Sequence, residues 1–438
     1  MNTIRPILKR KGIQITAIAV LSLLLVAAAV FTYYKLFMDP YRETISQPKA
    51  TLELNQTLSQ KQARKDLAYV KEQLEKYHPA YLDGSDEKIN EVAKQYQLEV
   101  SSLKDNITVL ELWQSAGRIA AKLEDGHTNI SVYHDAQDYY ISDLRQLKDY
   151  GKPIAINGVP VKEVYETFRS QFSCEREAYA EYIFYHMVIT SKNYLSFSGV
   201  DTSEGVVFTF QSDQESIDYP YHFVPRDQVI GLEEEEELPP VSYSMDQQHN
   251  LAVFCLKECD YNEEYLSKLQ AFFDDVSKNH IENIVVDLRD NPGGNSLAAN
   301  SFLEYINVDS YQSWDCAIRL GWYLKKYTNN VIENPKKEPL FTGKIFVLTN
   351  TRTYSSAMDF AMLIKDNQMG VLVGETSGNL PDSYGDTLGF QLPNSKLYLN
   401  VSYKKWYRVD KRKAGEPLEP DYVTESDNAL EKVYELMQ

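Results

Sequence analysis

The segment KIFVLTNTRTYSSAMDFAMLIKDNQMGVLVG, residues 344–374, decides the fold of this chain. Its first seven residues form an apolar run rich in β-branched side chains, which predicts a buried strand. Apolar residues then recur at helical spacing from residue 357 to residue 364, and VLVG predicts a second strand. Ser355 and Ser356 therefore fall at a sharp turn where a helix begins.

A serine at a helix start has two interpretations. Its hydroxyl faces backbone N–H groups that have no partner within the helix, and these favour a developing negative charge, so a serine nucleophile gains most there. Alternatively, Ser355 and Ser356 only cap the helix, as serine often does. Other segments of the chain decide between these interpretations.

Composition predicts a globular protein of two or three domains. The chain has 438 residues, of which 43% are hydrophobic and 12% aromatic. The formal net charge of −18 repels polyanions, so we expect no nucleic-acid partner. No Gly-Lys-Ser/Thr phosphate loop is present, and we expect no cofactor.

The amino terminus predicts a membrane segment. Arg5 and the basic residues up to Lys11 precede a stretch without charge from Ile13 to Tyr34, long enough to cross a bilayer of about 30 Å. Basic residues before the segment keep the amino terminus cytoplasmic and export the body. We therefore expect a single-pass membrane protein whose body lies outside the cytoplasm. A cleaved signal peptide, with a cut after the small residues 27–29, is the alternative and would give a secreted protein.

The cysteine and histidine patterns argue against a metal site. Cys255 and Cys259 have no matching pair at zinc-finger spacing. No two histidines lie four residues apart, as two zinc ligands on one helix would. Four cysteines in an exported chain are compatible with one or two disulfides, whose pairing the sequence does not choose.

Periodicity divides the chain into successive regions. We expect a basic segment at 1–12, a membrane segment at 13–37, a polar stalk at 38–60, a helical domain at 61–135, a mixed strand and helix region at 136–240 that ends in five glutamates, and a core at 241–438. In this last region strands and helices alternate, which predicts parallel crossovers and a three-layer α/β/α core. TLGFQLPNSKLYLNVSYKKWYRVD then alternates as an antiparallel pair.

The segment NIVVDLRDNPGGN, residues 283–295, predicts a strand followed by a bare turn. Gly293 and Gly294 leave backbone exposed at the carboxyl end of this strand, where open α/β sheets bind ligands. Two glycines let an N–H point into a site, as an oxyanion hole requires. A phosphate loop is excluded because no Gly-Lys-Ser/Thr follows.

VVDLRDNPGG, TYSSAMDFA and VGET, in this order, resemble the carboxy-terminal processing (tail-specific) peptidases and their relatives, which include the tricorn core protease. The resemblance begins near residue 61 and implies a crotonase-like/ClpP-like catalytic core. In the family the nucleophile is the serine three residues before an acidic residue. The resemblance therefore implies that the nucleophile is Ser356, which lies three residues before Asp359. It also implies that the backbone N–H groups of Ala357 and of the Gly293–Gly294 turn form the oxyanion hole.

The base distinguishes two branches of this family. Tail-specific members use a lysine in a Gly-Lys-Gly turn, but this chain reads GETSGNLPDSYGD and has no lysine from residue 366 to residue 395, so a serine–lysine dyad would need Lys365 or another lysine to fold back. LEDGHTNI resembles the DGHT segment of the tricorn-like branch, which implies that His127 is the base. Histidine, with an ordinary pKa of about 6.5, suits that role. We interpret His78, before a proline at a helix end, as structural.

The resemblance further implies an acid near the carboxyl terminus that orients the histidine. Asp410 is the first candidate because it follows an alternating strand, Glu416 is the second, and Glu419 is the third. KPIAINGVPV and the helix after it resemble the arrangement without a PDZ module.

These patterns predict an extracytoplasmic serine endopeptidase that cleaves protein or peptide substrates through an acyl-enzyme, with no metal. A catalytically inactive peptide- or glycan-binding protein on the same scaffold is the alternative. The presence of DGHT and SAMD in one chain favours the enzyme, because a binding protein needs neither a base nor a nucleophile.

Overall fold

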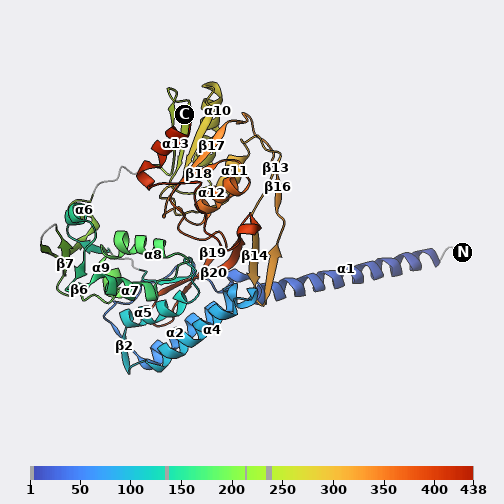
Figure 1. The fold of residues 1–438 in the computed structure, drawn as a ribbon. Helices are drawn as coiled ribbons and strands as arrows, with labels where there is room; N and C mark the ends of the chain where they lie inside the picture. Colours follow the sequence, from blue (N-terminus) through green and yellow to red (C-terminus); the bar gives the residue numbers. More distant parts are fainter. Residues whose placement is uncertain (1–3, 134–137, 213–214, 233–238, 438) are drawn as a thin grey trace.

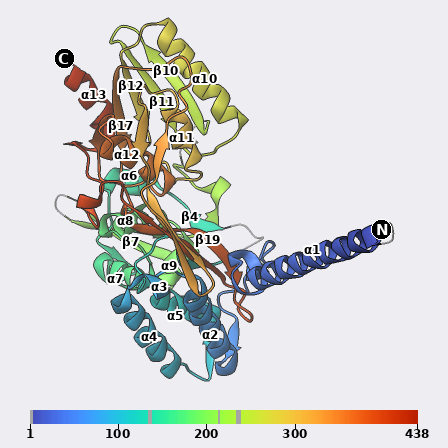
Figure 2. The same ribbon diagram turned by 90° about the vertical axis from the view of Figure 1, so that its right-hand side faces the viewer.

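The computed structural model describes residues 4–133, 138–212, 215–232 and 239–437. The five glutamates that end the mixed region, and His134, lie outside the described residues. Helix α1 (Ile4–Phe37) extends away from the body (Figures 1 and 2). Within it, Ile18–Phe37 has a mean hydropathy of 1.9 and no part of it is buried. A membrane span and a signal sequence both have this length and composition.

The amino-terminal helices form where the periodicity predicts them. Ser59 and Thr108 each close a capping box with the glutamine or glutamate three residues later, which fixes where two of the helices begin. The helices are α2 (Gln60–Tyr77), α3 (Ala80–Asp83), α4 (Asp86–Ser101) and α5 (Val109–Ala121).

The segment expected as a stalk lies along the body. It contains the 3-10 helix η1 (Pro40–Glu43) and strand β1 (Thr57–Ser59), which pairs with β2 (Asn106–Thr108). The backbone N–H of Ile45 donates to the carbonyl of Gly389 at 2.9 Å, and Thr51 is buried. The polar composition of this segment therefore reflects a surface strap. It contacts β2 in the amino-terminal part of the chain and Gly389 in the carboxyl-terminal part.

The middle region combines short strands and helices. A hairpin forms around the Asn-Gly turn of KPIAINGVPV, where Ala155–Ile156 (β5) pairs with Val159–Pro160 (β6). The other elements are β4 (Tyr139–Ile141), α6 (Arg145–Tyr150), α7 (Val161–Gln171), α8 (Glu177–Ile183), η2 (Phe184–Val188), α9 (Lys192–Phe197), β7 (Val206–Gln211), β8 (Ser216–Tyr221), β9 (Phe223–Pro225) and η3 (Arg226–Gln228).

The core is a six-stranded sheet in the order β10-β11-β12-β17-β18-β21. All neighbours are parallel except β10 and β11, so the predicted crossovers are confirmed. Side chains of three helices share one hydrophobic cluster with one face of the sheet, and α13 packs on the other face (Figure 1). The elements are β10 (Val241–Asp246), β11 (Leu251–Leu256), α10 (Glu263–Lys278), β12 (Asn283–Asp287), α11 (Leu297–Leu303), β17 (Lys344–Thr349), α12 (Ser356–Asp366), β18 (Val371–Gly374), β21 (Tyr422–Val423) and α13 (Ala429–Met437).

A second sheet joins the two ends of the chain. Its order is β15-β14-β20-β19, and the short strand β3 also pairs with β20. Asn129 of β3 lies opposite Asn400 of β20, which brings the segment just after His127 to the carboxyl-terminal hairpin. The strands are β3 (Asn129–Ser131), β14 (Asp315–Leu320), β15 (Tyr323–Tyr327), β19 (Ser383–Gln391) and β20 (Tyr398–Tyr407); β13 (Ser310–Gln312) and β16 (Val331–Glu333) form a separate pair, and η4 (Lys411–Lys413) and η5 (Ser426–Asn428) complete the chain.

All four cysteines are free thiols. Cys174 and Cys259 are buried, and burial is the main cause that raises the pKa of each thiol, to about 11 and about 12. The disulfides that the sequence left open are therefore not formed.

Candidate active site

The serine turn lies between β17 and α12. Ser355 precedes the helix with φ 52° and ψ −126°, a backbone conformation that non-glycine residues rarely adopt. Its side chain makes no capping hydrogen bond, so the helix-capping interpretation does not describe this turn. Strained residues of this kind concentrate at functional sites, because the surrounding structure must hold them in place.

Ser356 is the first residue of α12 and opens into a pocket of about 670 Å³. Its side chain is largely enclosed, with the residue 5% exposed. The hydroxyl donates to the carbonyl of Gly294 at 2.8 Å and lies 2.9 Å from the hydroxyl of Ser296. The pocket is also lined by His127, Asn295, Leu297, Asn300, Trp314, Asp359, Asn379, Ser383, Tyr384, Gly385, Asp386, Thr387, Lys404 and Trp406.

The glycine turn after β12 lies against the serine turn. Gly293 has φ +106°, and a Cβ there would lie 2.7 Å from the Cβ of Ser355, so only glycine permits this approach. The N–H of Gly293 donates to the side chain of Asn291 at 2.8 Å, and the N–H of Ala357 donates to the carbonyl of Tyr354 at 3.1 Å. Two of the N–H groups expected in an oxyanion hole are thus engaged within the protein.

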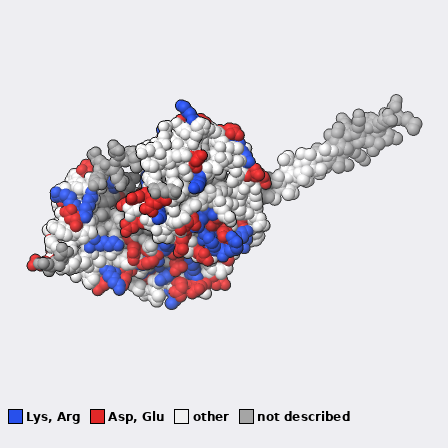
Figure 3. All heavy atoms as spheres, turned by 45° about the horizontal axis from the view of Figure 1, so that its top comes forward, with Lys and Arg blue, Asp and Glu red and all other residues white. Residues whose placement is uncertain are grey.

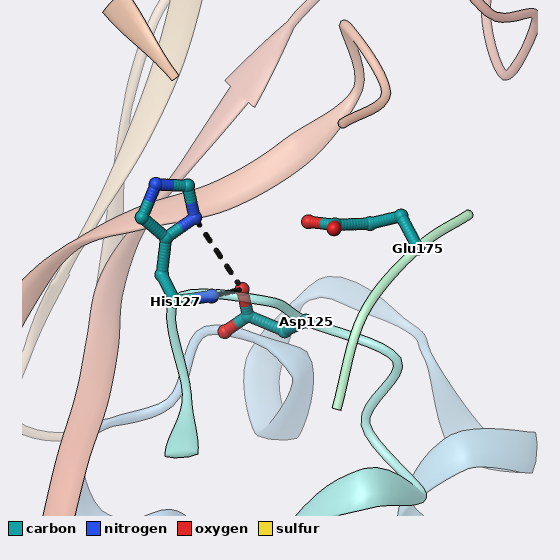
Figure 4. A group of neighbouring side chains, drawn as sticks. All are labelled: Asp125, His127 and Glu175. Atoms are coloured by element: carbon teal, nitrogen blue, oxygen red, sulfur yellow. Dashed lines mark hydrogen bonds and ion pairs between the residues drawn. The ribbon is translucent and has the colours of Figure 1, made fainter. Parts of the chain in front are cut away.

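His127 reaches the same pocket from the opposite end of the chain. It follows the turn after α5 and precedes β3, whose pairing with β20 holds it there. The side chain is 18% exposed, and its Nδ1 lies 3.7 Å from Oδ1 of Asp125. Figure 4 shows the imidazole standing above the Asp125 carboxylate, with Nδ1 facing Asp125 and the other ring nitrogen facing away from it.

Asp125 is buried and held from both sides. Its Oδ1 accepts the backbone N–H of His127 at 3.0 Å, and its Oδ2 lies 3.1 Å from Nε2 of His78. Because the N–H of Ala80 donates to Nδ1 of His78, the proton of neutral His78 sits on Nε2 and is donated to Asp125. His78, which the sequence suggested was structural, thus contacts the carboxylate beside His127.

Burial by itself would raise the pKa of Asp125, but its hydrogen bonds with His127 and His78 hold that pKa well below the usual range. Burial opposes the charged form of His127, yet the Asp125 carboxylate, 3.7 Å from Nδ1, raises the pKa of His127 above 6.5. Asp125 is therefore an ionised partner that favours a proton on Nδ1 of His127 and leaves Nε2 free to accept one.

Glu175 approaches this pair from the loop before α8. Burial, together with the charge of Asp125, raises the pKa of Glu175 to about 7, and its Oε2 accepts the hydroxyl of Tyr354 at 3.1 Å. Ligand atoms of Asp125, His127 and Glu175 all lie within 4.8 Å of one another, so these three residues could hold a metal ion (Figure 4). A metal on Nδ1 of His127 would displace the proton that Asp125 favours there, so a histidine base and a metal at this cluster exclude each other.

The structure does not bring Asp410 to His127. The Asp410 carboxylate caps η4 and accepts hydrogen bonds from the guanidinium of Arg412 at 2.8 and 3.0 Å, and Arg412 lowers its pKa to about 2. Glu416 offers its backbone carbonyl to Arg408. Neither these residues nor Glu419 line the pocket. The expectation for Asp410 fails because a basic residue two positions along the chain takes the carboxylate.

Two lysines, Lys365 and Lys404, are candidates for the base of a serine–lysine dyad. Lys365 forms an ion pair with Asp421 and does not line the pocket. Lys404 of β20 does line it, with Nζ 3.3 Å from the Asp386 carboxylate. Lys404 lies beyond the lysine-free stretch of residues 366–395, and its alternation with Ser402 and Trp406 on β20 could have placed it on one face of that strand.

Comparisons with known proteins bear on the family and the fold. Residues 256–424 match the sequence profile described as Peptidase family S41. The structure described as mature CPAF is 14% identical, has a TM-score of 0.60, and is matched over 86% of this chain and 96% of that one. Mature CPAF complexed with lactacystin gives 13% identity, a TM-score of 0.58, and coverage of 86% and 97%. At such identities the two structures show a shared fold.

Proposed function

The chain carries a domain of peptidase family S41 over residues 256–424, and on that premise we propose that it is a serine endopeptidase with Ser356 as nucleophile and His127 as base. One observation carries the proposal: the two residues, far apart in sequence, line one pocket. Base and nucleophile in a single cavity are what acyl transfer requires.

In the proposed acylation, Ser356 Oγ attacks the carbonyl carbon of a peptide bond and its proton passes to Nε2 of His127. Asp125 stabilises the imidazolium that forms, and His78 keeps Asp125 in place. The hydroxyl of Ser356 must first turn away from the carbonyl of Gly294, to which it now donates. Catalytic hydrogen bonds commonly form only when substrate is bound.

His127 then donates the same proton to the leaving amine, and the bond between carbon and nitrogen breaks. A water molecule, deprotonated by His127, attacks the acyl-enzyme and releases the acid product and the free serine. Backbone N–H groups of the Gly293–Gly294 turn and of Ala357 are the proposed oxyanion donors. Those of Gly293 and Ala357 must exchange their present internal acceptors for the substrate oxygen.

Lys404 supplies a second candidate for the base, because it lines the same pocket. Its amine faces Asp386 and also lies 5.3 Å from the ring centre of Trp406. These contacts hold the amine against an acid and an aromatic ring, whereas His127 is backed by a carboxylate that can stabilise the imidazolium formed by proton transfer. We therefore prefer His127 as the base.

We also propose that α1 anchors the protein in a membrane, with the body outside the cytoplasm. The unburied apolar stretch Ile18–Phe37 supports the anchor, and the basic residues before it support the orientation.

Turnover of a quenched-fluorescent peptide library by four variants tests the proposal. Ser356→Ala and His127→Ala should lose activity, whereas Ser355→Ala, a matched change one residue from the nucleophile, should keep most of it. Lys404→Met should leave measurable turnover. Activity that survives Ser356→Ala would refute the nucleophile, and activity that survives His127→Ala but not Lys404→Met would exchange the base.

A further inference from the structure

The hairpin of β14 and β15 ends in an exposed aromatic tip. Leu320 pairs with Tyr323, so the loop consists of Gly321 and Trp322 alone. Gly321 has φ +56°, the conformation that short hairpin loops require. Trp322 is 66% exposed and Tyr323 is 47% exposed. A tryptophan at the tip of a rigid loop contributes little to a core and is suited to meet another surface.

This tip rests on the end of α1. The indole N–H of Trp322 donates to the hydroxyl of Tyr33 at 3.1 Å. The backbone at Gly321 approaches α1 so closely that a Cβ there would lie 2.0 Å from the carbonyl oxygen of Phe37. Figure 1 shows β14 close to the point where α1 meets the body.

The contact fixes the depth of the tip relative to a bilayer that α1 spans. The 20 residues of Ile18–Phe37 correspond to about 30 Å at about 1.5 Å per residue, the thickness of the hydrocarbon core. Tyr33 lies four residues, or about 6 Å along the helix, inside the Phe37 end. Trp322, which is hydrogen-bonded to Tyr33, therefore sits at the level where hydrocarbon gives way to headgroups.

The chemistry of the tip fits that level. Tryptophan and tyrosine concentrate where hydrocarbon meets headgroups. Lys325 and Lys326 follow on β15, and lysines beside a membrane surface extend toward lipid phosphates. These charges are opposite in sign to the net charge of the whole chain, so the tip is locally suited to anionic lipid.

The tip of the hairpin is tied to the candidate site through Arg319, which pairs with Leu324 next to the loop. The guanidinium of Arg319 donates to the carbonyls of Glu75 and His78 at 2.8 and 2.9 Å, and His78 in turn donates to Asp125. We propose that the Gly321–Trp322 tip inserts into the headgroup layer of the bilayer beside α1. This second membrane contact fixes the orientation of the pocket relative to the surface. The inference rests on the proposed anchor and is independent of the peptidase assignment.

Fluorescence quenching by brominated lipids tests this contact. The full chain is reconstituted in vesicles of phosphatidylcholine and phosphatidylglycerol whose acyl chains carry bromine near the headgroup, and its tryptophan emission is compared with that in unbrominated vesicles. The chain has four tryptophans. Wild type should be quenched, Trp322→Phe should lose most of that quenching, and Trp314→Phe, the same substitution inside the pocket, should keep it.

Equal quenching of wild type and Trp322→Phe would overturn the insertion. Retention of the protein in the membrane after alkaline carbonate, measured on the same vesicles, reports on the anchor separately. A chain that carbonate releases would overturn the anchor and the tip contact together. Peptide turnover in the same vesicles shows whether the peptidase assignment stands when either membrane proposal fails.

Discussion

Replacement of Asp125 by asparagine would show how the site holds its proposed base. Oδ2 of Asp125 accepts a proton from Nε2 of His78, and Oδ1 accepts the backbone N–H of His127 while facing its Nδ1. Asparagine has one oxygen and one NH₂ group. Whichever way the amide is turned, one of these two donors faces NH₂ in place of an acceptor.

The substitution should have two effects, one on stability and one on turnover. A buried donor left without an acceptor costs about 1–3 kcal/mol of stability. If Asp125 holds His127 in the tautomer that accepts the serine proton, the variant should also lose about 10²–10⁴-fold in turnover. That loss corresponds to about 2.7–5.4 kcal/mol of transition-state stabilisation.

The pH profile separates a positioning role from a merely structural one. His127 acts as a base only when it is neutral. Burial lowers the pKa of His127, but Asp125 outweighs this effect and raises that pKa above 6.5. Wild-type kcat/KM should therefore fall as the pH drops through this raised pKa. Removal of the Asp125 charge lowers the pKa of His127, so the acid limb of the variant should move to lower pH.

The assay is kcat/KM on a fluorogenic peptide from pH 5 to pH 9, with stability measured by urea unfolding. An Asp125→Asn variant that is less stable, yet has the wild-type rate and acid limb, would refute the reasoning.

Further changes have defined outcomes. His127→Ala should lower kcat/KM by about 10²–10⁴-fold without changing the circular dichroism spectrum, and undiminished turnover would point to a lysine base. Glu175→Gln should raise the free energy of unfolding above pH 7, by on the order of 3 kcal/mol at most. At pH 4 the substitution should give no such gain, and urea unfolding at both pH values measures the difference. The folded Glu175 carboxyl titrates near 7 and the unfolded one near 4.5, so stability falls as pH rises between these values; a gain at pH 4 would contradict this. Gly293→Ala should cost on the order of 10²-fold in turnover, because its Cβ would displace the serine turn. Gly158→Ala, with a positive φ but open space around it, is the matched control, and equal losses in both would remove the argument. EDTA should leave turnover unchanged, and activity restored by zinc after chelation would overturn the serine mechanism.

Local patterns predicted the elements of the core well. The alternation of apolar strands and amphipathic helices after residue 241 gave the parallel sheet, because each strand buried on both faces reads as a continuous apolar run. The sequence also suffices to place the glycine turn beside the serine turn, since both follow strands of one sheet and the carboxyl ends of parallel strands meet at one edge.

The acid partner was harder to predict because it depends on contacts within the fold. Asp125 lies two residues before His127, but nothing in the sequence shows that His78 would meet its other oxygen. Glu175 comes from a loop with no motif of its own. Asp410 looked well placed at the end of a strand, yet Arg412 takes its carboxylate.

The segment of residues 38–60 was misleading for a related reason. Its polar composition resembles a free connector, whereas the backbone of Ile45 bonds to β19 and Thr51 is buried. A strap of this kind is held mainly by backbone hydrogen bonds, which leave no hydrophobic period in the sequence.

The most direct test of the central claim is to label the protein with a fluorophosphonate and locate the adduct by peptide mass spectrometry. The account predicts one modified residue, Ser356, with labelling lost in Ser356→Ala, strongly slowed in His127→Ala and retained in Ser355→Ala. An adduct on another residue, or labelling of Ser356 that proceeds at the wild-type rate without His127, would contradict the account.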